Sequence, residues 1–295
     1  MRALIFGANG QDGHYLSAFC QKEKIEVQGV SRGGPWNRGN VQDFSSVRDR
    51  IRTFRPTHIF HFAAISSTQH DALFANDAAI SGGTLNILEA VKQIGIQCKV
   101  FLPGSGVQFK NIGEPISEFD EFVPSSPYSV SRIHSVYTAR YYRGLGIPVY
   151  IGYLFHHDSP WRSRRHVSQK IAHAALRIGN GAMEKLRLGD IGVEKEWSFA
   201  GDIIQGILTL MSQKRVFEAV IGSGKAYSIQ QWVEGCFKAI GKDWREYVEE
   251  DSTHVAEYKR LVSNPTTMRL LGWEPTVQFD DLVDLMMVSQ ERAFV

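Results

Sequence analysis

The chain has 295 residues, of which 43% are hydrophobic and 22% are charged, and its formal net charge is +2. This length suffices for a sizeable core and about two domains, and the near-zero charge does not favour nucleic acid or a membrane as a partner. No apolar run is long enough to span a bilayer and the N-terminus lacks the zones of a signal peptide, so we expect a cytoplasmic protein. The three cysteines, Cys20, Cys98 and Cys236, lie far apart, which predicts buried free thiols and no metal site.

The first fifteen residues, MRALIFGANGQDGHY, predict a buried strand, a tight turn and the start of a helix. The apolar run Ala3–Phe6 indicates the strand, and Gly7 permits a sharp turn at its end. Gly10 leaves room for a pyrophosphate against backbone N–H groups, and Gly13 lets the helix pack closely on the sheet. Three spaced glycines are also found in ordinary turns, but their position directly after the first strand favours a dinucleotide site.

Beyond this turn, strand-like and helix-like segments alternate, which is typical of a parallel sheet with right-handed crossovers. The predicted fold class is therefore α/β, a Rossmann-like doubly wound sheet, in which ligands lie beyond the carboxyl ends of the strands. The glycine-rich segment Gly33–Asn40 predicts an exposed loop. Further strands are predicted at Glu26–Val30, His58–Phe62, Lys99–Leu102 and Pro148–Leu154, and helices at Gln11–Lys22, Phe44–Thr53, Asp77–Ile94 and Tyr128–Tyr142.

The end of the second predicted strand indicates which dinucleotide the turn would bind. A site for NAD places a carboxylate there to hold the ribose hydroxyls, yet no acidic residue occurs from Val27 to Gln42. Ser31 and Arg32 occupy this position instead, and a guanidinium can pair with a 2′-phosphate. The sequence thus predicts NADP(H) in preference to NAD(H). The alternative is that Arg32 is a solvated loop residue.

Three residues resemble a catalytic group. Tyr128 and Arg132 are four residues apart in the helix-compatible segment SPYSVSR, so both project from one face. Ser105 follows the predicted strand Lys99–Leu102, at the functional edge of the sheet. We therefore expect these three side chains to lie together, the alternative for Tyr128 being an ordinary packing role.

Several segments together resemble the extended short-chain dehydrogenase/reductases, over essentially the whole chain. Within that superfamily the chain is most similar to the GDP-mannose 4,6-dehydratases and their reductase relatives. This resemblance implies an NADP-binding Rossmann domain at 1–155, a smaller domain at 156–295 that mainly binds a nucleotide sugar, with segments interleaved, and a homodimer or homotetramer. The segments are GQDGHYL, FHFAA, SPYSVSR, LFHHDSP, LRLGDIGVEKEWSFAGD and LGWEP.

The resemblance also assigns catalytic roles. Tyr128 would exchange a proton with a sugar hydroxyl or ketone, and Ser105 would hold that oxygen. The basic residue four positions after the tyrosine is normally lysine, which binds the nicotinamide ribose, whereas this chain has Arg132. Dehydratases of the family carry Thr-x-Glu after the fourth strand, and here that motif is Ser105, Gly106 and Val107. Because valine cannot transfer a proton, elimination of water lacks its usual acid and base.

The function predicted from these residues is NADP-dependent reduction of a 4-keto group on a GDP-linked 6-deoxyhexose. One alternative is a 4,6-dehydratase that uses His156 or His157 in place of the missing glutamate. Another is a catalytically inactive NADP-binding or partner protein. A metal cluster at His156, His157 and Asp158 is disfavoured, because adjacent strand residues point to opposite faces.

The resemblance adds further site residues to those argued above. The arginines Arg162, Arg164 and Arg165 would contact phosphate or form a solvated loop, and the helices Asp77–Ile94 and Tyr128–Tyr142 would pack within the subunit or form a dimer seam. Cofactor contacts are expected at Gly7, Asn9, Gly10, Gln11, Asp12, Gly13, Arg32, Asn40, Val41, Phe62, Ala63, Ala64, Tyr128, Arg132 and His157. Substrate contacts are expected at Ser67, His156, Val167, Lys170, Lys195, His254 and Glu257.

Overall fold

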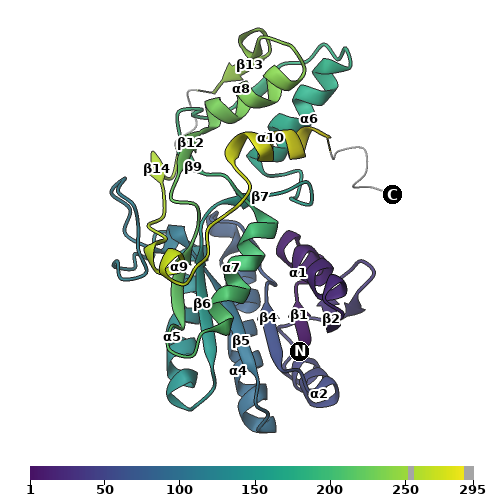
Figure 1. Ribbon diagram of the computed structural model, residues 1–295, viewed down its shortest axis with the longest axis vertical. Helices are drawn as coiled ribbons and strands as arrows, with labels where there is room; N and C mark the ends of the chain where they lie inside the picture. The colour runs from purple at the N-terminus through teal and green to yellow at the C-terminus, as the bar shows by residue number, and fades with distance from the viewer. Residues whose placement is uncertain (252–255, 289–295) are drawn as a thin grey trace.

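A computed structural model describes residues 1–251 and 256–288 of the chain. The predicted substrate residue His254 lies outside the described residues. Figure 1 shows a lower layered part, which contains the central sheet, and an upper lobe of helices and short strands.

The lower part is built on a seven-stranded sheet in which every described pairing is parallel. The strand order is β11-β6-β5-β4-β1-β2-β3, so the order reverses between β1 and β4, and the two sides wind in opposite directions. This confirms the predicted doubly wound sheet and places the ligand region at the carboxyl ends of β1 and β4. The strands are β1 Arg2–Phe6, β2 Glu26–Ser31, β3 Asn37–Arg38, β4 His58–His61, β5 Lys99–Ser105, β6 Val149–Leu154 and β11 Glu218–Ile221.

Helices cover both faces of this sheet (Figure 1). Apolar side chains of α2, α4 and α5, among them Ile51 and Leu88, pack with one face, whereas those of α1 and α7, among them Leu16 and Ile204, pack with the other. The sequence forms these layers because its strands are apolar on both sides and its helices on one. The helices are α1 Gln11–Lys22, α2 Phe44–Phe54, α4 Gly83–Ile94, α5 Pro127–Gly144 and α7 Ala200–Ser212.

Two predicted segments differ from the structure. The segment Gly33–Asn40 is not entirely loop, because Asn37–Arg38 forms the edge strand β3, which is too short and polar to show a strand pattern. The predicted helix Asp77–Ile94 begins as a π-helical turn at Asp77–Gly82, and only then continues as α4. A Cβ at Gly83 would lie 2.9 Å from Nε2 of His61, so the glycine lets this helix approach the sheet closely.

The upper lobe has a core of its own. Trp232, Phe237 and Met286 are fully buried there, on helices α8 Ile229–Ala239 and α10 Phe279–Val288.

No described helix is long and apolar enough to cross a membrane. The predicted division at residue 155 stays a prediction, although α7 and β11 return from the second half of the chain to the sheet. The other elements are α3 Leu73–Asn76, α6 Val167–Gly179, α9 Thr266–Leu270, β7 His157–Asp158, β8 Leu186–Leu188, β9 Glu194–Glu196, β10 Ser198–Phe199, β12 Ala226–Ser228, β13 Val248–Glu250 and β14 Arg260–Leu261, with 3₁₀ turns at His70–Ala72, Gly106–Gln108 and Trp244–Glu246.

Candidate active site

The glycine turn after β1 has the geometry that the sequence predicts. Gly7 has a φ of +87°, and a Cβ there would lie 2.5 Å from the backbone nitrogen of Ala63. A Cβ at Gly13 would lie 2.5 Å from the carbonyl oxygen of Gly7. Gly10 is the N-cap of α1, so no side chain of the cap residue covers the first N–H groups of the helix. The turn therefore leaves backbone donors accessible at the carboxyl end of β1.

A first cavity of about 350 Å³ opens over this turn, between the ends of β1, β2 and β4. Among the described residues, those that line it include no aspartate or glutamate but do include Arg32. Gln11 and Gly13 do not line it, because the Gln11 Oε1 atom accepts a hydrogen bond from Ser159 Oγ at 2.9 Å and Gly13 faces the turn itself. Nine predicted cofactor residues line the cavity: Gly7, Asn9, Gly10, Arg32, Asn40, Val41, Phe62, Ala63 and Ala64.

A second cavity of about 290 Å³ adjoins the first at Phe62 and Ala64. Ser105 at the end of β5, and Tyr128 and Arg132 on the first turns of α5, all line this second cavity. Ser126 caps α5 by accepting a hydrogen bond of 3.2 Å from the backbone nitrogen of Ser129, which fixes the helix start next to the strand ends. The structure thus brings together the three side chains that the sequence pattern grouped.

Arg132 is held toward the sheet. Its side chain is buried, its Nη1 atom donates a hydrogen bond of 2.8 Å to the carbonyl oxygen of Pro103, and its guanidinium lies 5.0 Å from the centre of the Tyr128 ring. Val107 lines the same cavity, so the position at which the resemblance leads one to expect a glutamate presents an apolar side chain.

His157 contacts the first turn of helix α1. Its Nε2 atom lies 2.9 Å from Oδ1 of Asp12, and its Nδ1 atom lies 2.8 Å from the carbonyl oxygen of Phe155. Both neighbours accept hydrogen bonds, so the ring fits the doubly protonated form. Burial lowers the pKa of His157, but the charge and the hydrogen bond of Asp12 outweigh it and raise this pKa overall. Burial opposes ionisation of Asp12, but His157 and then Arg162 bring its pKa to about 2.

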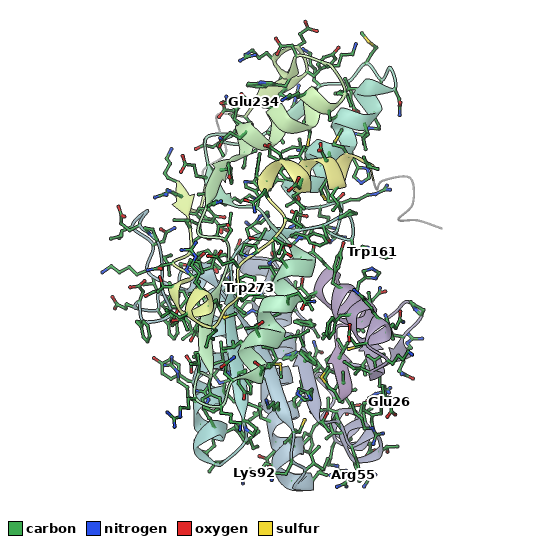
Figure 2. The ribbon with its side chains drawn as sticks, viewed as in Figure 1. Glu26, Arg55, Lys92, Trp161, Glu234 and Trp273 are labelled. Carbon is green, nitrogen blue, oxygen red and sulfur yellow. The ribbon has the colours of Figure 1, made fainter. Side chains whose placement is uncertain are left out.

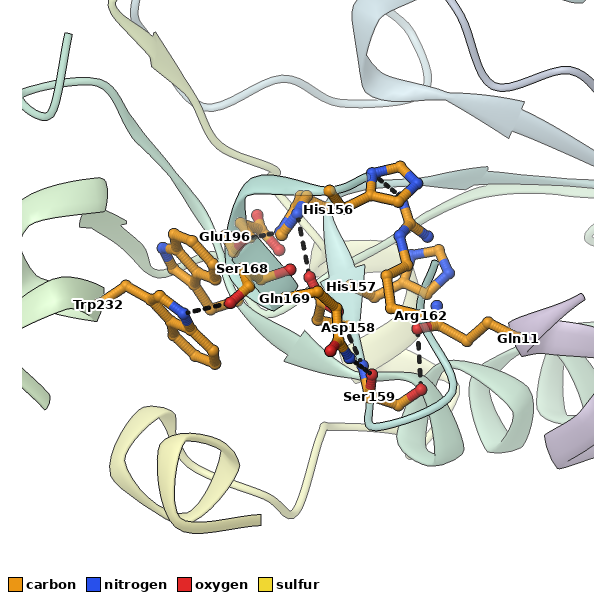
Figure 3. Close-up of polar contacts among 12 residues, drawn as sticks. Gln11, His156, His157, Asp158, Ser159, Arg162, Ser168, Gln169, Glu196 and Trp232 are labelled. Atoms are coloured by element: carbon orange, nitrogen blue, oxygen red, sulfur yellow. Dashed lines mark hydrogen bonds and ion pairs between the residues drawn. The ribbon is translucent and has the colours of Figure 1, made fainter. Parts of the chain in front are cut away.

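His156 points to the other side of the chain (Figure 3). Its Nδ1 atom lies 2.7 Å from the carbonyl oxygen of Glu196, and its Nε2 atom lies 3.5 Å from Oδ2 of Asp158. Burial lowers the pKa of His156 well below its usual value and raises the pKa of Asp158. A neutral, internally bonded imidazole is a poor proton donor.

In the described part of the chain, no three histidine, cysteine or acidic side chains are placed to hold a metal.

The sequence left open whether the arginine cluster is functional, and the structure separates its members. Arg162 lines the second cavity, with Nη2 3.4 Å from Nδ1 of His166, whereas Arg164 and Arg165 are exposed outside it. The charge of Arg162 lowers the pKa of Asp12 and opposes the rise at Asp158. Asp12 and Arg162 are 150 positions apart, so no local pattern could reveal this cluster.

A third cavity of about 250 Å³ lies in the upper lobe and shares Glu257 and Tyr258 with the second. Three of the predicted substrate residues, Val167, Lys195 and Glu257, line it. Burial lowers the pKa of Lys195 to about 8.

Two predicted substrate residues lie outside the lining of these three cavities. Lys170 is exposed and donates a hydrogen bond of 2.5 Å to the carbonyl oxygen of Arg187. The carbonyl oxygen of Ser67 accepts a hydrogen bond of 2.8 Å from Asn76.

The doubly wound sheet, the glycine turn at its reversal point and the adjoining Ser–Tyr cavity define an extended short-chain dehydrogenase/reductase. Its family follows from the sequence comparison. The family model of GDP-mannose 4,6 dehydratase matches residues 4–286, and the chain belongs to this family.

Curated relatives agree with this placement, and solved structures share the fold. GDP-mannose 4,6 dehydratase 2 of Arabidopsis thaliana is 30% identical over 96% of this chain and 85% of its own length. The human GDP-mannose 4,6 dehydratase is 26% identical over 95% of this chain and 89% of its own. The UDP-glucose 4-epimerase of Thermus thermophilus in complex with NAD has a TM-score of 0.86 at 22% identity, covering 100% of both chains. RMD from Pseudomonas aeruginosa, complexed with NADPH, has a TM-score of 0.85 at 21% identity, covering 99% of both chains. At these identities the two structures support the fold.

Proposed function

We propose that this protein reduces the 4-keto group of a GDP-linked 6-deoxyhexose with NADPH. One observation carries the proposal: Ser105 and Tyr128 share a cavity in which position 107 holds an apolar side chain. Proton transfer to a carbonyl oxygen needs only a hydroxyl donor, whereas elimination of water needs an additional acid and base.

The first two cavities fit a nicotinamide dinucleotide. The first contains the uncapped N-terminus of α1, which suits a pyrophosphate, and the second contains Tyr128. Arg32 and the lack of a carboxylate among the described lining residues favour a 2′-phosphate, hence NADP(H). Gly10 and Asn9 would border the pyrophosphate, Asn40 and Val41 the adenosine, and His157 the nicotinamide end.

NADPH, when bound, supplies the hydride for the keto carbon. Tyr128 donates its phenolic proton to the keto oxygen, and Ser105 orients that oxygen by hydrogen bonding. Arg132 places a positive charge beneath the Tyr128 ring, where it stabilises the tyrosinate that remains. The hydrogen bond from Arg132 to the carbonyl oxygen of Pro103 holds the guanidinium next to the Tyr128 ring. Arg132 would therefore supply the positive charge of the family lysine without its contact to the nicotinamide ribose.

A 4,6-dehydratase is the second candidate, because the matching family has that activity in its name. This reaction requires a group that moves a proton near Val107. Both histidines that the sequence suggests line the second cavity. Their ring nitrogens are already engaged, however, His156 with Glu196 and His157 with Asp12 and Phe155. Reduction therefore accounts better for the residues in the cavity.

The test is NADPH oxidation by the purified protein given GDP-4-keto-6-deoxymannose, with mass spectrometry of the product. We expect the sugar to gain two hydrogens as NADPH is consumed. Tyr128→Phe should lower kcat by about 10²–10⁴-fold, because the proton donor is lost. Tyr247→Phe, in the upper lobe and away from the described cavities, is the matched control. Conversion of GDP-mannose without net loss of NADPH would instead establish the dehydratase. NADPH binding with neither conversion would establish the non-catalytic alternative.

We further propose a homodimer or homotetramer. Four large side chains with exposures of 45–65% lie on α4 and α5. Exposed apolar side chains gathered on adjacent helices suit an interface with the same helices of a second copy. Light scattering should therefore give a mass of at least twice the 33.2 kDa of one chain. A monomer at micromolar concentration would contradict this assembly. The four residues are Leu85, Val130, Tyr137 and Tyr141.

A further inference from the structure

The third cavity contains a carboxylate that the proposed reaction does not use. Asp190 lies in the turn that follows β8 and lines this cavity. Its Oδ1 atom accepts a hydrogen bond of 2.9 Å from the backbone N–H of Gly192. The turn therefore fixes the side chain in the cavity wall.

The second oxygen of Asp190 is available to a ligand. Oδ2 lies 3.4 Å from Nζ of Lys259, whose side chain is 91% exposed, whereas that of Asp190 is 28% exposed. An ion pair with such an exposed lysine contributes little. A ligand N–H that enters the cavity can therefore compete for this oxygen, and the ammonium group of Lys259 would then be solvated by water.

The rest of the wall suits a flat ring system. Val167, Leu188, Val193 and Ile229 give it aliphatic surfaces, and Tyr258 adds an aromatic ring. A mostly apolar cavity with a few fixed polar groups is typical of small-molecule sites. Glu257 and Tyr258 also line the second cavity, which contains Tyr128. A ligand with its base in the third cavity can therefore extend toward Tyr128.

The donor pattern of the ring decides which base a carboxylate selects. Guanine presents two adjacent donors, N1–H and the 2-amino group, which match the two oxygens of a carboxylate. Uracil and thymine have one N–H between two carbonyl oxygens, and adenine and cytosine have an acceptor nitrogen beside the amino group. A carboxylate that meets an acceptor is left with an unpaired, desolvated charge, which is costly.

We propose that Asp190 is a specificity-determining residue that accepts hydrogen bonds from N1–H and the 2-amino group of a guanine base. This inference rests on the proposed function, since it assigns the base of the same nucleotide sugar. It concerns binding, so it can be tested without turnover.

The experiment measures the Kd of the full-length protein for GDP, IDP, XDP and UDP by calorimetry. Wild type should bind GDP best, IDP less well because hypoxanthine lacks the amino group, and XDP at least about 10-fold more weakly, because its C2 carbonyl faces the carboxylate. Asp190→Asn should invert the GDP-to-XDP preference, because the amide can donate to that carbonyl. The asparagine keeps an oxygen for the Gly192 N–H, so the turn should stay intact.

Lys259→Gln is the matched control, since it removes the ion pair and leaves the carboxylate. It should keep the wild-type order of affinities. An unchanged GDP-to-XDP ratio in Asp190→Asn overturns the inference and leaves the proposed function standing. UDP bound as tightly as GDP by wild type overturns the inference together with the guanine part of the proposed substrate. If wild type binds none of the four diphosphates, the proposed function fails as well.

Discussion

The two cavities that meet at Phe62 and Ala64 are built from different groups. The first is formed mainly by backbone, glycines and small side chains at the ends of neighbouring strands. The second is lined by charged side chains from both lobes, including Asp12, His157 and Arg162. Substitutions in the first should therefore act through sterics, and those around the second through charge and hydrogen bonding.

The largest effect is expected at the glycine turn. Gly7→Ala places a Cβ 2.5 Å from a backbone nitrogen at a φ of +87°, and strain plus overpacking should cost about 3 kcal/mol or more. We expect a fall in Tm of at least about 5 °C by calorimetry. Gly144→Ala is the control, because a Cβ there meets nothing within 4 Å and φ is not positive. Equal Tm values for the two variants would contradict the steric role of the turn.

The next effect concerns the buried Glu196, which lies beside the second cavity. Its carboxylate accepts backbone hydrogen bonds from Ser223, Gly224 and Ser263 and is fully buried. Glu196→Gln turns one acceptor into a donor that faces other donors, and we expect a loss of about 2–3 kcal/mol in the free energy of unfolding. Glu194→Gln, on the same strand but paired with a part-exposed arginine, should cost less than about 1 kcal/mol.

A smaller, pH-dependent effect is expected at the ion pair between Asp12 and His157. The raised pKa of His157 stabilises the fold below its unfolded value of 6.5, and this is lost as pH rises through the folded pKa. The lowered pKa of Asp12, about 2 instead of 3.8, stabilises the fold above pH 3.8, and this is lost as pH falls through about 2. Asp12→Asn should thus lower Tm most between about pH 4 and 6.5.

The control for this pH profile is Asp49→Asn, which removes a surface carboxylate next to Arg52. Its Tm difference from wild type should stay small at every pH. A pH-independent deficit in Asp12→Asn would mean that Asp12 acts through packing rather than charge.

The smallest effect is expected at the surface of the upper lobe. Arg187 pairs with Glu249, and their side chains are 81% and 45% exposed. Arg187→Gln should change the free energy of unfolding by less than about 0.5 kcal/mol, measured by urea denaturation, because water screens such pairs. A loss above 1 kcal/mol would show that charge matters outside the buried cluster as well.

The sequence by itself determined the layered part of the fold and the groups on its strand ends. Apolar runs and helical periods are local properties, so the sheet, the turn at Gly7 and the meeting of Ser105, Tyr128 and Arg132 could be predicted. The predicted helix Gln11–Lys22 has the same bounds in the structure. The π-helical turn and the edge strand β3 were missed, because neither has a pattern of its own.

Only the tertiary structure decided which charges meet. Asp12 and His157 are 145 positions apart. The contact of His156 with Glu196 likewise joins residues that only the fold places together. No sequence pattern distinguishes Asp190, and only the folded chain places it in the wall of the third cavity. Electrostatic and hydrogen-bond partners depend on distance in space, which chain folding sets and sequence spacing does not reveal.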